Sequence, residues 1–305
     1  MSSSRIGVSI VAYRPEAQAL NLLLEALAPR HGEIVVVDNG GAAAVISSGL
    51  RDRIVLIEPG ENVGVAAGHN LAIAQIFAKG CSHALLFDQD SLPLEGMIDQ
   101  LLQEEQALLS AGHAVAAIGP IHQSAVDGEP SGFVRFSGCR PQVIRHADAD
   151  LPGASCRCDF LITSGTLLRR EAFEIVGPFD ESLFIDNVDV EWCYRAASFG
   201  LRCHGAVKAR MRHALGDRAI RIPFSRRQLV IHSPMRIYFI TRNRWLLYWL
   251  PHVSLGWKLA DFPRMLIKLM AFMLFVPPRS RYLKAGFAGL RDGIRRKGGA
   301  ARASY

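Results

Sequence analysis

Two carboxylates stand one residue apart at the end of an apolar run. Residues 84–87 are apolar, and Asp88, Gln89 and Asp90 follow them directly. If the run is a buried strand, both carboxylates reach the carboxyl edge of a sheet, where divalent cations and diphosphates are commonly bound. The pair therefore indicates sugar-nucleotide chemistry, although a solvated strand end or a helix cap gives the same pattern.

A second group of polar residues could contact a nucleoside. Asp38 and Asn39 end another apolar run, where they could bond a pyrimidine or ribose edge or form an Asx-turn. Small residues between 60 and 70 would let a ligand approach backbone N–H groups, with Asn62 and Asn70 as side-chain contacts. The segment has neither a dinucleotide fingerprint nor a P-loop, which argues against hydride transfer and ATP hydrolysis.

A third group is acidic and opens a helix expected over residues 189–199. Asp186, Asp189 and Glu191 lie at its start, where the helix dipole favours an ionised carboxylate. Such a carboxylate could act as a general base for displacement at a sugar carbon, or it could simply cap the helix. His213 lies 24 residues after Asp189 and could complete a cation site or be structural.

Alternating strands and helices must position these groups. The apolar pattern predicts strands over 6–13, 33–37 and 53–57 and one ending at Asp88, with helices over 19–27 and 66–78. This order is typical of an α/β fold with a doubly wound, largely parallel sheet flanked by helices. Residues 112–160 are less regular. A strand is expected over 160–168, with Gly165 marking a bulge or the close approach of a ligand or another backbone.

The charge is divided unevenly along the chain. Residues 1–201 carry a net charge of −12, and residues 202–305 carry +19. This split indicates an acidic, metal-using front and a basic rear suited to phosphates or an anionic lipid surface. The apolar runs at 245–250 and 265–276 are too short to span a membrane, so we expect helices lying on an anionic leaflet. An ordinary helical subdomain with a solvated basic tail is the alternative, and no nucleic-acid-binding module is recognisable.

The six cysteines are expected to be reduced thiols. Polar residues 1–5 lead directly into a strand-like run, so no secretory leader is expected. Cys156 and Cys158 have the wrong spacing for a zinc knuckle, and no second Cys/His pair follows at a suitable distance.

Several ordered motifs together resemble the inverting glycosyltransferases of family 2, which have the GT-A fold. The resemblance covers roughly residues 5–245 and is closest to bacterial rhamnosyltransferases that use dTDP-L-rhamnose in O-antigen or cell-wall polysaccharide synthesis. The motifs that carry it are Val8–Tyr13, Val36–Asn39, Glu61–Gly64 with Gly68–Asn70, Phe87–Ser91, Ser164–Thr166 and Phe184–Arg195.

The resemblance implies roles for individual residues. Asp189 aligns with the family's base, and Asp88, Asp90 and His213 would hold Mg²⁺ or Mn²⁺ on the diphosphate, with Asp88 facing the ribose or the metal. Many members carry an acid directly before the base, whereas this chain has Val188 there, so Asp186 and Glu191 stay possible bases, and Trp192 stays a possible acceptor contact. The expected contacts to the nucleotide sugar are Ala12, Tyr13, Asp38, Asn39, Asn62, Asn70, Asp88 and Gly165.

The same resemblance implies an organisation and partners. Residues 1–244 would form the transferase domain, with a nucleotide-sugar half at 1–111 and an acceptor half at 112–244, and residues 245–305 would form a basic helical region. The acceptor would be a polyprenyl-diphosphate-linked or other saccharide at the inner face of the cell membrane. A UDP- or GDP-hexose donor, a nucleotidyltransferase and a non-catalytic sugar-nucleotide-binding scaffold remain the alternatives.

Overall fold

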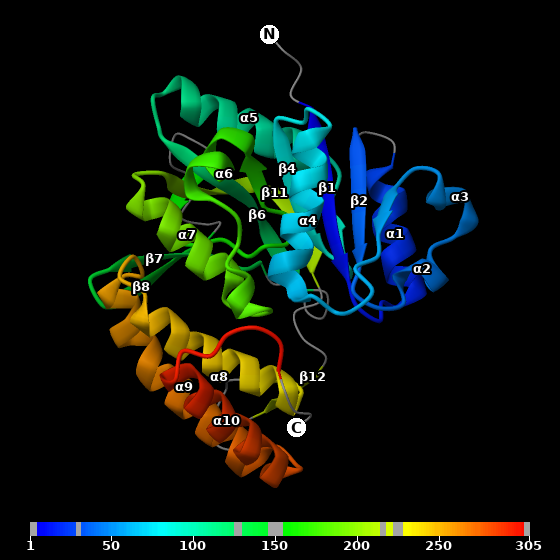
Figure 1. Ribbon diagram of the computed structural model, residues 1–305. Helices are drawn as coiled ribbons and strands as arrows, with labels where there is room; N and C mark the ends of the chain where they lie inside the picture. Colours follow the sequence, from blue (N-terminus) through cyan, green and yellow to red (C-terminus); the bar gives the residue numbers. More distant parts are fainter. Residues whose placement is uncertain are drawn as a thin grey trace.

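The computed structural model describes residues 5–28, 32–124, 130–145, 155–213, 218–221 and 228–301, with the backbone alone at 124, 213, 218–221 and 228–230. Its centre is a nine-stranded mixed sheet whose strands run in the order β3-β2-β1-β4-β10-β6-β11-β5, with β9 also paired to β11 (Figure 1). The strands are β1 (Ile6–Ala12), β2 (Glu33–Asp38), β3 (Val55–Ile57), β4 (His83–Asp88), β5 (Ser91–Pro93), β6 (Val115–Ser124), β9 (Ser155–Cys158), β10 (Leu167–Arg169) and β11 (Arg202–His213).

The first half of the sheet is parallel, as expected from the sequence. Strands β1, β2, β3 and β4 all run in one direction, and β6 and β11 form a further parallel pair. Short β10 joins the two halves because it pairs antiparallel with both β4 and β6. The polar residues that end β1, β2 and β4 therefore meet at one edge.

Helices cover both faces of the sheet. Side chains alternate along the strands, so Val35 and Val37 pack in one core while Ile10 and Val36 pack in the other. The first core is covered by α4 (Gly64–Ala78), α6 (Arg170–Val176) and α7 (Val188–Ser198). The second is covered by α1 (Ala17–Leu27), α2 (Ala42–Val45), α3 (Ser48–Arg51) and α5 (Met97–Ser110).

The middle of the chain is more regular than expected in one segment and less regular in another. Residues 112–160, expected to be less regular, include β6, a ten-residue central strand, and β9 of the same sheet. The strand expected over 160–168 is reduced to β10, since Gly165 has a φ of +80° and Thr166 N–H bonds Thr163 O in a turn. The turn diverts residues 161–166 toward the carboxyl edge.

Small β-ribbons and three helices complete the structure. The ribbons are β7 (Phe133–Ser137) with β8 (Arg140–Ile144), and β12 (Arg218–Arg221) with β13 (Gln228–Ile231). The helices are α8 (Pro234–Trp249), α9 (Leu255–Phe275) and α10 (Arg279–Ile294), and Figure 1 shows them on the side of the molecule to which the parallel strands point.

The helical region begins earlier than the sequence suggests. Ser233 caps α8 by accepting a hydrogen bond from Arg236 N–H, and Pro234 occupies the first turn. The expected boundary at 244–245 therefore falls inside α8, which packs closely against α10. Within the described part of the chain, no helix is long and apolar enough to cross a membrane.

Candidate functional site

The strand register brings the ends of three strands together at the carboxyl edge. Ala12 at the end of β1 pairs with Asp38 of β2, and Val11 pairs with Asp88 of β4. Gln89 then links β4 back to β1, because its side chain accepts a hydrogen bond from Tyr13 N–H (2.7 Å) and donates one to Tyr13 O (3.3 Å). This pair of hydrogen bonds holds the chain where it leaves β4. At this point Asp88 is half-buried and Asp90 is exposed.

A single turn lies between Asp88 and Asp189. Asp88 N–H donates to the Ser164 hydroxyl (3.1 Å), and the neighbouring Thr163 N–H donates to the Asp189 carboxylate (3.3 Å). Ser164 is itself held, since its hydroxyl donates to Ser91 (2.6 Å) and its carbonyl accepts from His122 Nε2 (2.8 Å). The fold thus brings the second carboxylate of the expected mechanism next to the first, about a hundred residues away in sequence.

The Asp189 carboxyl holds its proton more tightly than an ordinary aspartate. Burial raises its pKa from 3.8 to about 6, and the nearby charges of Asp88 and Asp186 add to the rise. Hydrogen bonds from the N–H groups of Val190 and Thr163 act in the opposite direction but are smaller effects. A carboxylate with a pKa near neutrality is suited to accept a proton from a hydroxyl.

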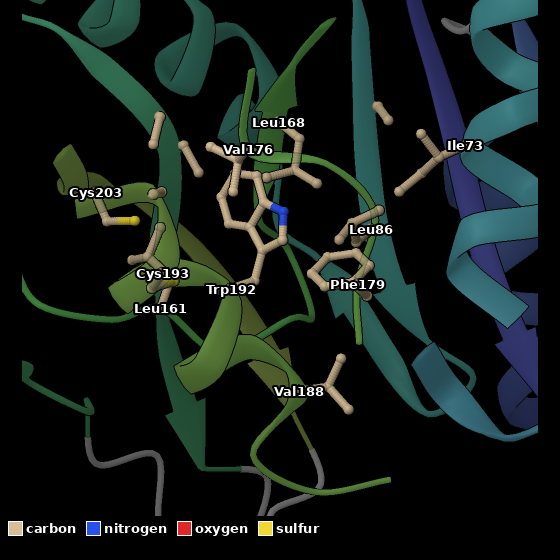
Figure 2. Close-up of a cluster of buried hydrophobic side chains, with 14 of the residues drawn as sticks. Ile73, Leu86, Leu161, Leu168, Val176, Phe179, Val188, Trp192, Cys193 and Cys203 are labelled. Atoms are coloured by element: carbon tan, nitrogen blue, oxygen red, sulfur yellow. The ribbon is translucent and has the colours of Figure 1, made fainter. Parts of the chain in front are cut away.

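Helix α7 is anchored by its other face. Val188 and Trp192 point into the hydrophobic cluster drawn in Figure 2, where Trp192 packs among Leu86, Phe179 and their neighbours. The indole is 1 % exposed and donates to Gly177 O (2.9 Å). Trp192 therefore positions α7 and has no surface to offer an acceptor.

The two alternative bases are already partnered. Glu191 is 2 % exposed and lies against Arg195 (2.9 Å) and His252 Nε2 (2.8 Å). Asp186 accepts hydrogen bonds from the Arg236 guanidinium on both carboxylate oxygens (3.1–3.2 Å). Both carboxylates are therefore engaged by basic side chains of the protein itself. Asp189 is the one of these three acids in the described structure that no basic side chain contacts.

On the expected nucleoside side, several polar residues are used within the protein. Asp38 caps α2 by accepting from the N–H groups of Gly40, Ala42 and Ala43 (2.7–2.9 Å). Asn39 is 5 % exposed and bonds Gly64 O and Val63 N–H. These contacts shape the loops around the edge.

Asn62 and Asn70 are likewise bonded within the chain. Asn62 accepts from Gly64 N–H (2.9 Å), which orders the start of α4. Asn70 bonds both N–H and O of Phe179 and the Glu181 carboxylate, so it ties α4 to the segment before α7. Both asparagines therefore act as loop supports in this structure.

The remaining residues expected to contact the nucleotide sugar differ in their exposure to solvent. Ala12 is fully buried, whereas Tyr13 is 44 % exposed and its ring lies against Gly40. Gly165 faces protein, since a Cβ there would meet Met211 Sδ and Pro120 Cγ. Tyr13 thus offers an aromatic surface beside the strand ends, and the role of Gly165 is close packing.

The metal-binding side chains at this edge fit a magnesium or manganese ion. Asp88 and Asp90 supply carboxylate oxygens, and Mg²⁺ is commonly bound by one or two carboxylates together with phosphate oxygens of a substrate. No group of three metal-binding side chains occurs among the residues whose side chains are described. His213 pairs with Ser91 through the backbone, one residue beyond Asp90, but its side chain lies outside that description.

Some residues of the site were not identified from the sequence. Gln89 and Ser164 hold the turn between the acids, and Arg236, Arg242 and Asn243 of α8 contact the loop before α7. Arg242 and Asn243 could have been noticed because they lie in a run of four polar residues, 241–244, between two apolar stretches. Their partners could not have been identified, because they lie about 60 residues away.

Comparison with known proteins points in the same direction. A family model described as "Glycosyltransferase like family 2" matches residues 4–246. The dTDP-rhamnosyl transferase RfbF of Shigella flexneri is 31 % identical over 303 residues, which cover 96 % of each chain.

Two solved structures share the GT-A-like fold at low sequence identity. GalNAc-T7, solved with UDP, GalNAc and Mn²⁺, superposes with a TM-score of 0.58 at 13 % identity over 95 % of this chain, which spans 56 % of that one. S. aureus TarS 1-349 gives a TM-score of 0.50 at 12 % identity, covering 95 % and 81 %.

Proposed function

Because this chain belongs to glycosyltransferase family 2, we propose that it transfers L-rhamnose from dTDP-β-L-rhamnose, with inversion, to a saccharide acceptor of surface polysaccharide synthesis. The observation that carries the mechanism is the Asp189 carboxylate, which lies beside Asp88 at the carboxyl edge with a pKa of about 6. The donor follows from the similarity to the rhamnosyl transferase of Shigella flexneri.

The reaction is a single in-line displacement. Asp189 accepts the proton of the acceptor hydroxyl while that oxygen attacks the anomeric carbon of rhamnose. The bond from that carbon to the diphosphate oxygen breaks as the new bond forms, and dTDP leaves with the bonding electrons. Attack from the opposite face converts the β-linked donor into an α-L-rhamnosyl product.

Metal dependence is part of the proposal. Asp88 and Asp90, with His213, would hold Mg²⁺ or Mn²⁺, which would neutralise the charge that develops on the leaving diphosphate. Asp90 is exposed at the edge, where its carboxylate would be accessible to a bound diphosphate, whereas the main chain of Asp88 is held by the Ser164 hydroxyl.

A thermal-shift screen of nucleotide sugars, with and without Mg²⁺ or Mn²⁺, tests both statements. We expect selective stabilisation by dTDP-L-rhamnose that requires the cation and is lost in Asp90→Ala. Stronger stabilisation by a UDP- or GDP-hexose would overturn the donor assignment. Retained cation-dependent affinity in Asp90→Ala would overturn the metal assignment. Binding without turnover of any acceptor would indicate a scaffold.

The C-terminal helices supply a surface suited to a lipid-linked acceptor. On α9, apolar side chains recur every three or four residues and are 41–68 % exposed, so they form one stripe; its members are Leu255, Leu259, Phe262, Leu266, Met270 and Leu274. A stripe of this kind, left open to solvent, is typical of a helix that lies in a membrane interface.

The exposed charges of residues 245–301 are positive. Exposed basic residues are Arg264, Arg279, Arg281, Lys284, Arg291, Arg295, Arg296 and Lys297. The two acids of residues 245–305 are already paired, Asp261 with Arg244 and Tyr248, and Asp292 with Tyr238 and Arg291. An anionic leaflet complements this surface, and we propose that the protein is peripheral on the inner face of the cell membrane, where a polyprenyl-diphosphate-linked saccharide would be presented.

A further inference from the structure

The loop that enters α7 has an unusual backbone. Phe184, Asp186 and Asn187 have φ values of 64°, 63° and 65°, a left-handed conformation that residues other than glycine seldom adopt. Asn187 is the N-cap of α7, and Asp189 is the second residue of that helix. The direction of the Asp189 side chain therefore depends on a loop whose conformation its own sequence does not favour.

Asn243 of α8 holds this loop by its carbonyls. Its side-chain amide nitrogen lies 2.8 Å from Leu183 O, 2.6 Å from Ile185 O and 2.8 Å from Asp186 O, and the side chain is fully buried. Two of these carbonyls belong to the residues on either side of Phe184, and the third belongs to Asp186. The two N–H donors of this buried amide are shared among the three carbonyls, which stabilises this loop conformation against others that would leave the carbonyls unpaired.

Arg242 holds the adjoining part of the same loop. Its guanidinium donates to Ser182 O (3.1 Å) and Leu183 O (2.9 Å), and its Nε donates to the side-chain oxygen of Asn243 (2.9 Å). It also donates to Gly299 O, and Gly299 N–H donates in turn to Ser182 O (2.6 Å). Arg242 is fully buried, and each oxygen that it contacts here is a neutral carbonyl or amide oxygen.

The loop is held from its other sides as well. Arg236 pairs with Asp186, and the Phe184 ring stacks on Phe239 of α8 with centroids 5.0 Å apart. Phe184 O accepts from Val65 N–H (2.6 Å) at the start of α4, on the expected donor side. The loop is therefore fixed between α8 and α4.

We propose that Arg242 and Asn243 are positioning residues for the catalytic base: by binding the carbonyls of residues 182–186, they set the entry of α7 that aims Asp189 at the acceptor. This inference rests on the proposed function for the role of Asp189. It makes α8 part of the catalytic apparatus, whereas the sequence placed the end of this helix in a membrane-proximal region.

The test compares two variants of the same helix. Asn243→Asp keeps the size of the side chain and the oxygen that accepts from Arg242, but it replaces the donor group by an oxygen that the three carbonyls repel. Tyr248→Phe is the control, because it removes a partly buried hydrogen bond to Asp261 that faces α9 and not the loop. Both are measured below their melting temperatures for kcat, donor KM, pH profile and amide hydrogen exchange.

We expect Asn243→Asp to lower kcat about 10- to 100-fold, change the donor KM less than about threefold, move the acid limb of the pH profile, and speed exchange within residues 182–192. Tyr248→Phe should lower the melting temperature without moving the acid limb or the exchange of that segment. A folded Asn243→Asp protein with wild-type kcat and an unmoved acid limb would overturn the proposal, as would unchanged exchange.

Failure of the proposed function and failure of the positioning role can be distinguished. If the wild-type protein does not turn over dTDP-L-rhamnose, the proposed donor has failed, and the exchange of residues 182–192 still tests whether Asn243 holds the loop. If Asn243→Asp does not fold, Arg242→Lys replaces it, because the ammonium keeps the charge but cannot donate to Ser182 O, Leu183 O and the Asn243 side-chain oxygen together. We then expect a loss in kcat with a displaced acid limb, and wild-type values of both would contradict the positioning role.

Discussion

Asp189 combines two properties that oppose each other. The carboxylate must be ionised to accept a proton, yet its burial beside Asp88 disfavours the charge and raises its pKa to about 6. The N–H groups of Thr163 and Val190 compensate only in part. As the proposed base, Asp189 would be active near neutral pH and inactive in mild acid.

The first prediction at this scale concerns the pH dependence of turnover. Since Asp189 must be ionised, kcat/KM should fall about tenfold per pH unit below pH 6 and level off above it. Steady-state rates in overlapping buffers at constant ionic strength would measure this limb. A limb near pH 4, the range of an ordinary aspartate, would contradict the assignment.

The second prediction concerns Asp189→Asn. Turnover should fall by about 10² to 10⁴-fold, with donor affinity retained, because the amide cannot accept the proton. Above pH 6, the Asp189→Asn protein should be more stable than the wild type. With a folded-state pKa above the unfolded value of 3.8, the contribution of Asp189 is fully present below pH 3.8 and is lost as the pH rises through 6.

This loss is about 3 kcal/mol, and the neutral amide avoids it. Denaturant unfolding of both proteins at pH 4 and pH 7.5 would measure it. The stability difference between Asp189→Asn and the wild type should be near zero at pH 4 and should favour the variant at pH 7.5; equal differences at the two pH values would show that Asp189 is not the buried, neutralised group.

At the scale of elements, α8 is the link between the sheet domain and the C-terminal helices. One side of α8 holds the loop before α7, and the other packs against α10 at glycine positions. A Cβ at Gly289 would lie 2.5 Å from Tyr238 O, and one at Gly293 would lie 2.8 Å from Arg242 O. The close approach of the two helices thus requires residues without side chains.

The third prediction tests this contact. Gly289→Ala should destabilise the fold by about 1–3 kcal/mol, because the new methyl group meets backbone that cannot move without separating the helices. Gly49→Ala in α3 is the matched control, since a Cβ there meets nothing within 4 Å; it should be neutral or stabilise by up to about 1 kcal/mol. Denaturant midpoints would decide, and equal effects would rule out a packing role for Gly289.

At the scale of the whole molecule, the charge division of the sequence becomes a division in space. The acidic residues 1–201 form most of the sheet with its carboxyl-edge site. The basic residues 202–305 contribute the C-terminal helices, which lie on the same side of the molecule as this edge (Figure 1). If α9 rests on a leaflet, the carboxyl edge is held near the lipid headgroups, where a lipid-linked sugar would be available.

The fourth prediction is a loss of vesicle binding in surface variants. Leu259→Glu and Leu266→Glu should each weaken flotation with anionic vesicles about tenfold, because each removes an inserted apolar side chain and adds a repelled charge. Phe199→Glu, at a residue 56 % exposed after α7, is the control. Binding of the wild type should also weaken as salt is raised. Undiminished flotation of both α9 variants would mean that this stripe does not contact lipid.

The sequence by itself determined the class of fold and the position of the first carboxylate pair. Continuous apolar runs of strand length that alternate with helices have few other stable arrangements, and a strand that ends in Asp88 must place that residue at an edge. The extent of α7 was equally predictable, because its apolar periodicity and its acidic start are local signals.

Only the tertiary structure decided which polar residues are engaged within the protein. Asp38 forms a local turn that the sequence had left open, but Asn39 and Asn70 bond backbone groups from other segments, and a sequence does not show such partners. The same holds for Asn243 and the loop before α7, about 60 residues apart. A hydrogen bond depends on the final position of both atoms, whereas hydrophobic periodicity depends on neighbours along the chain, so the architecture could be predicted and the support of the site could not.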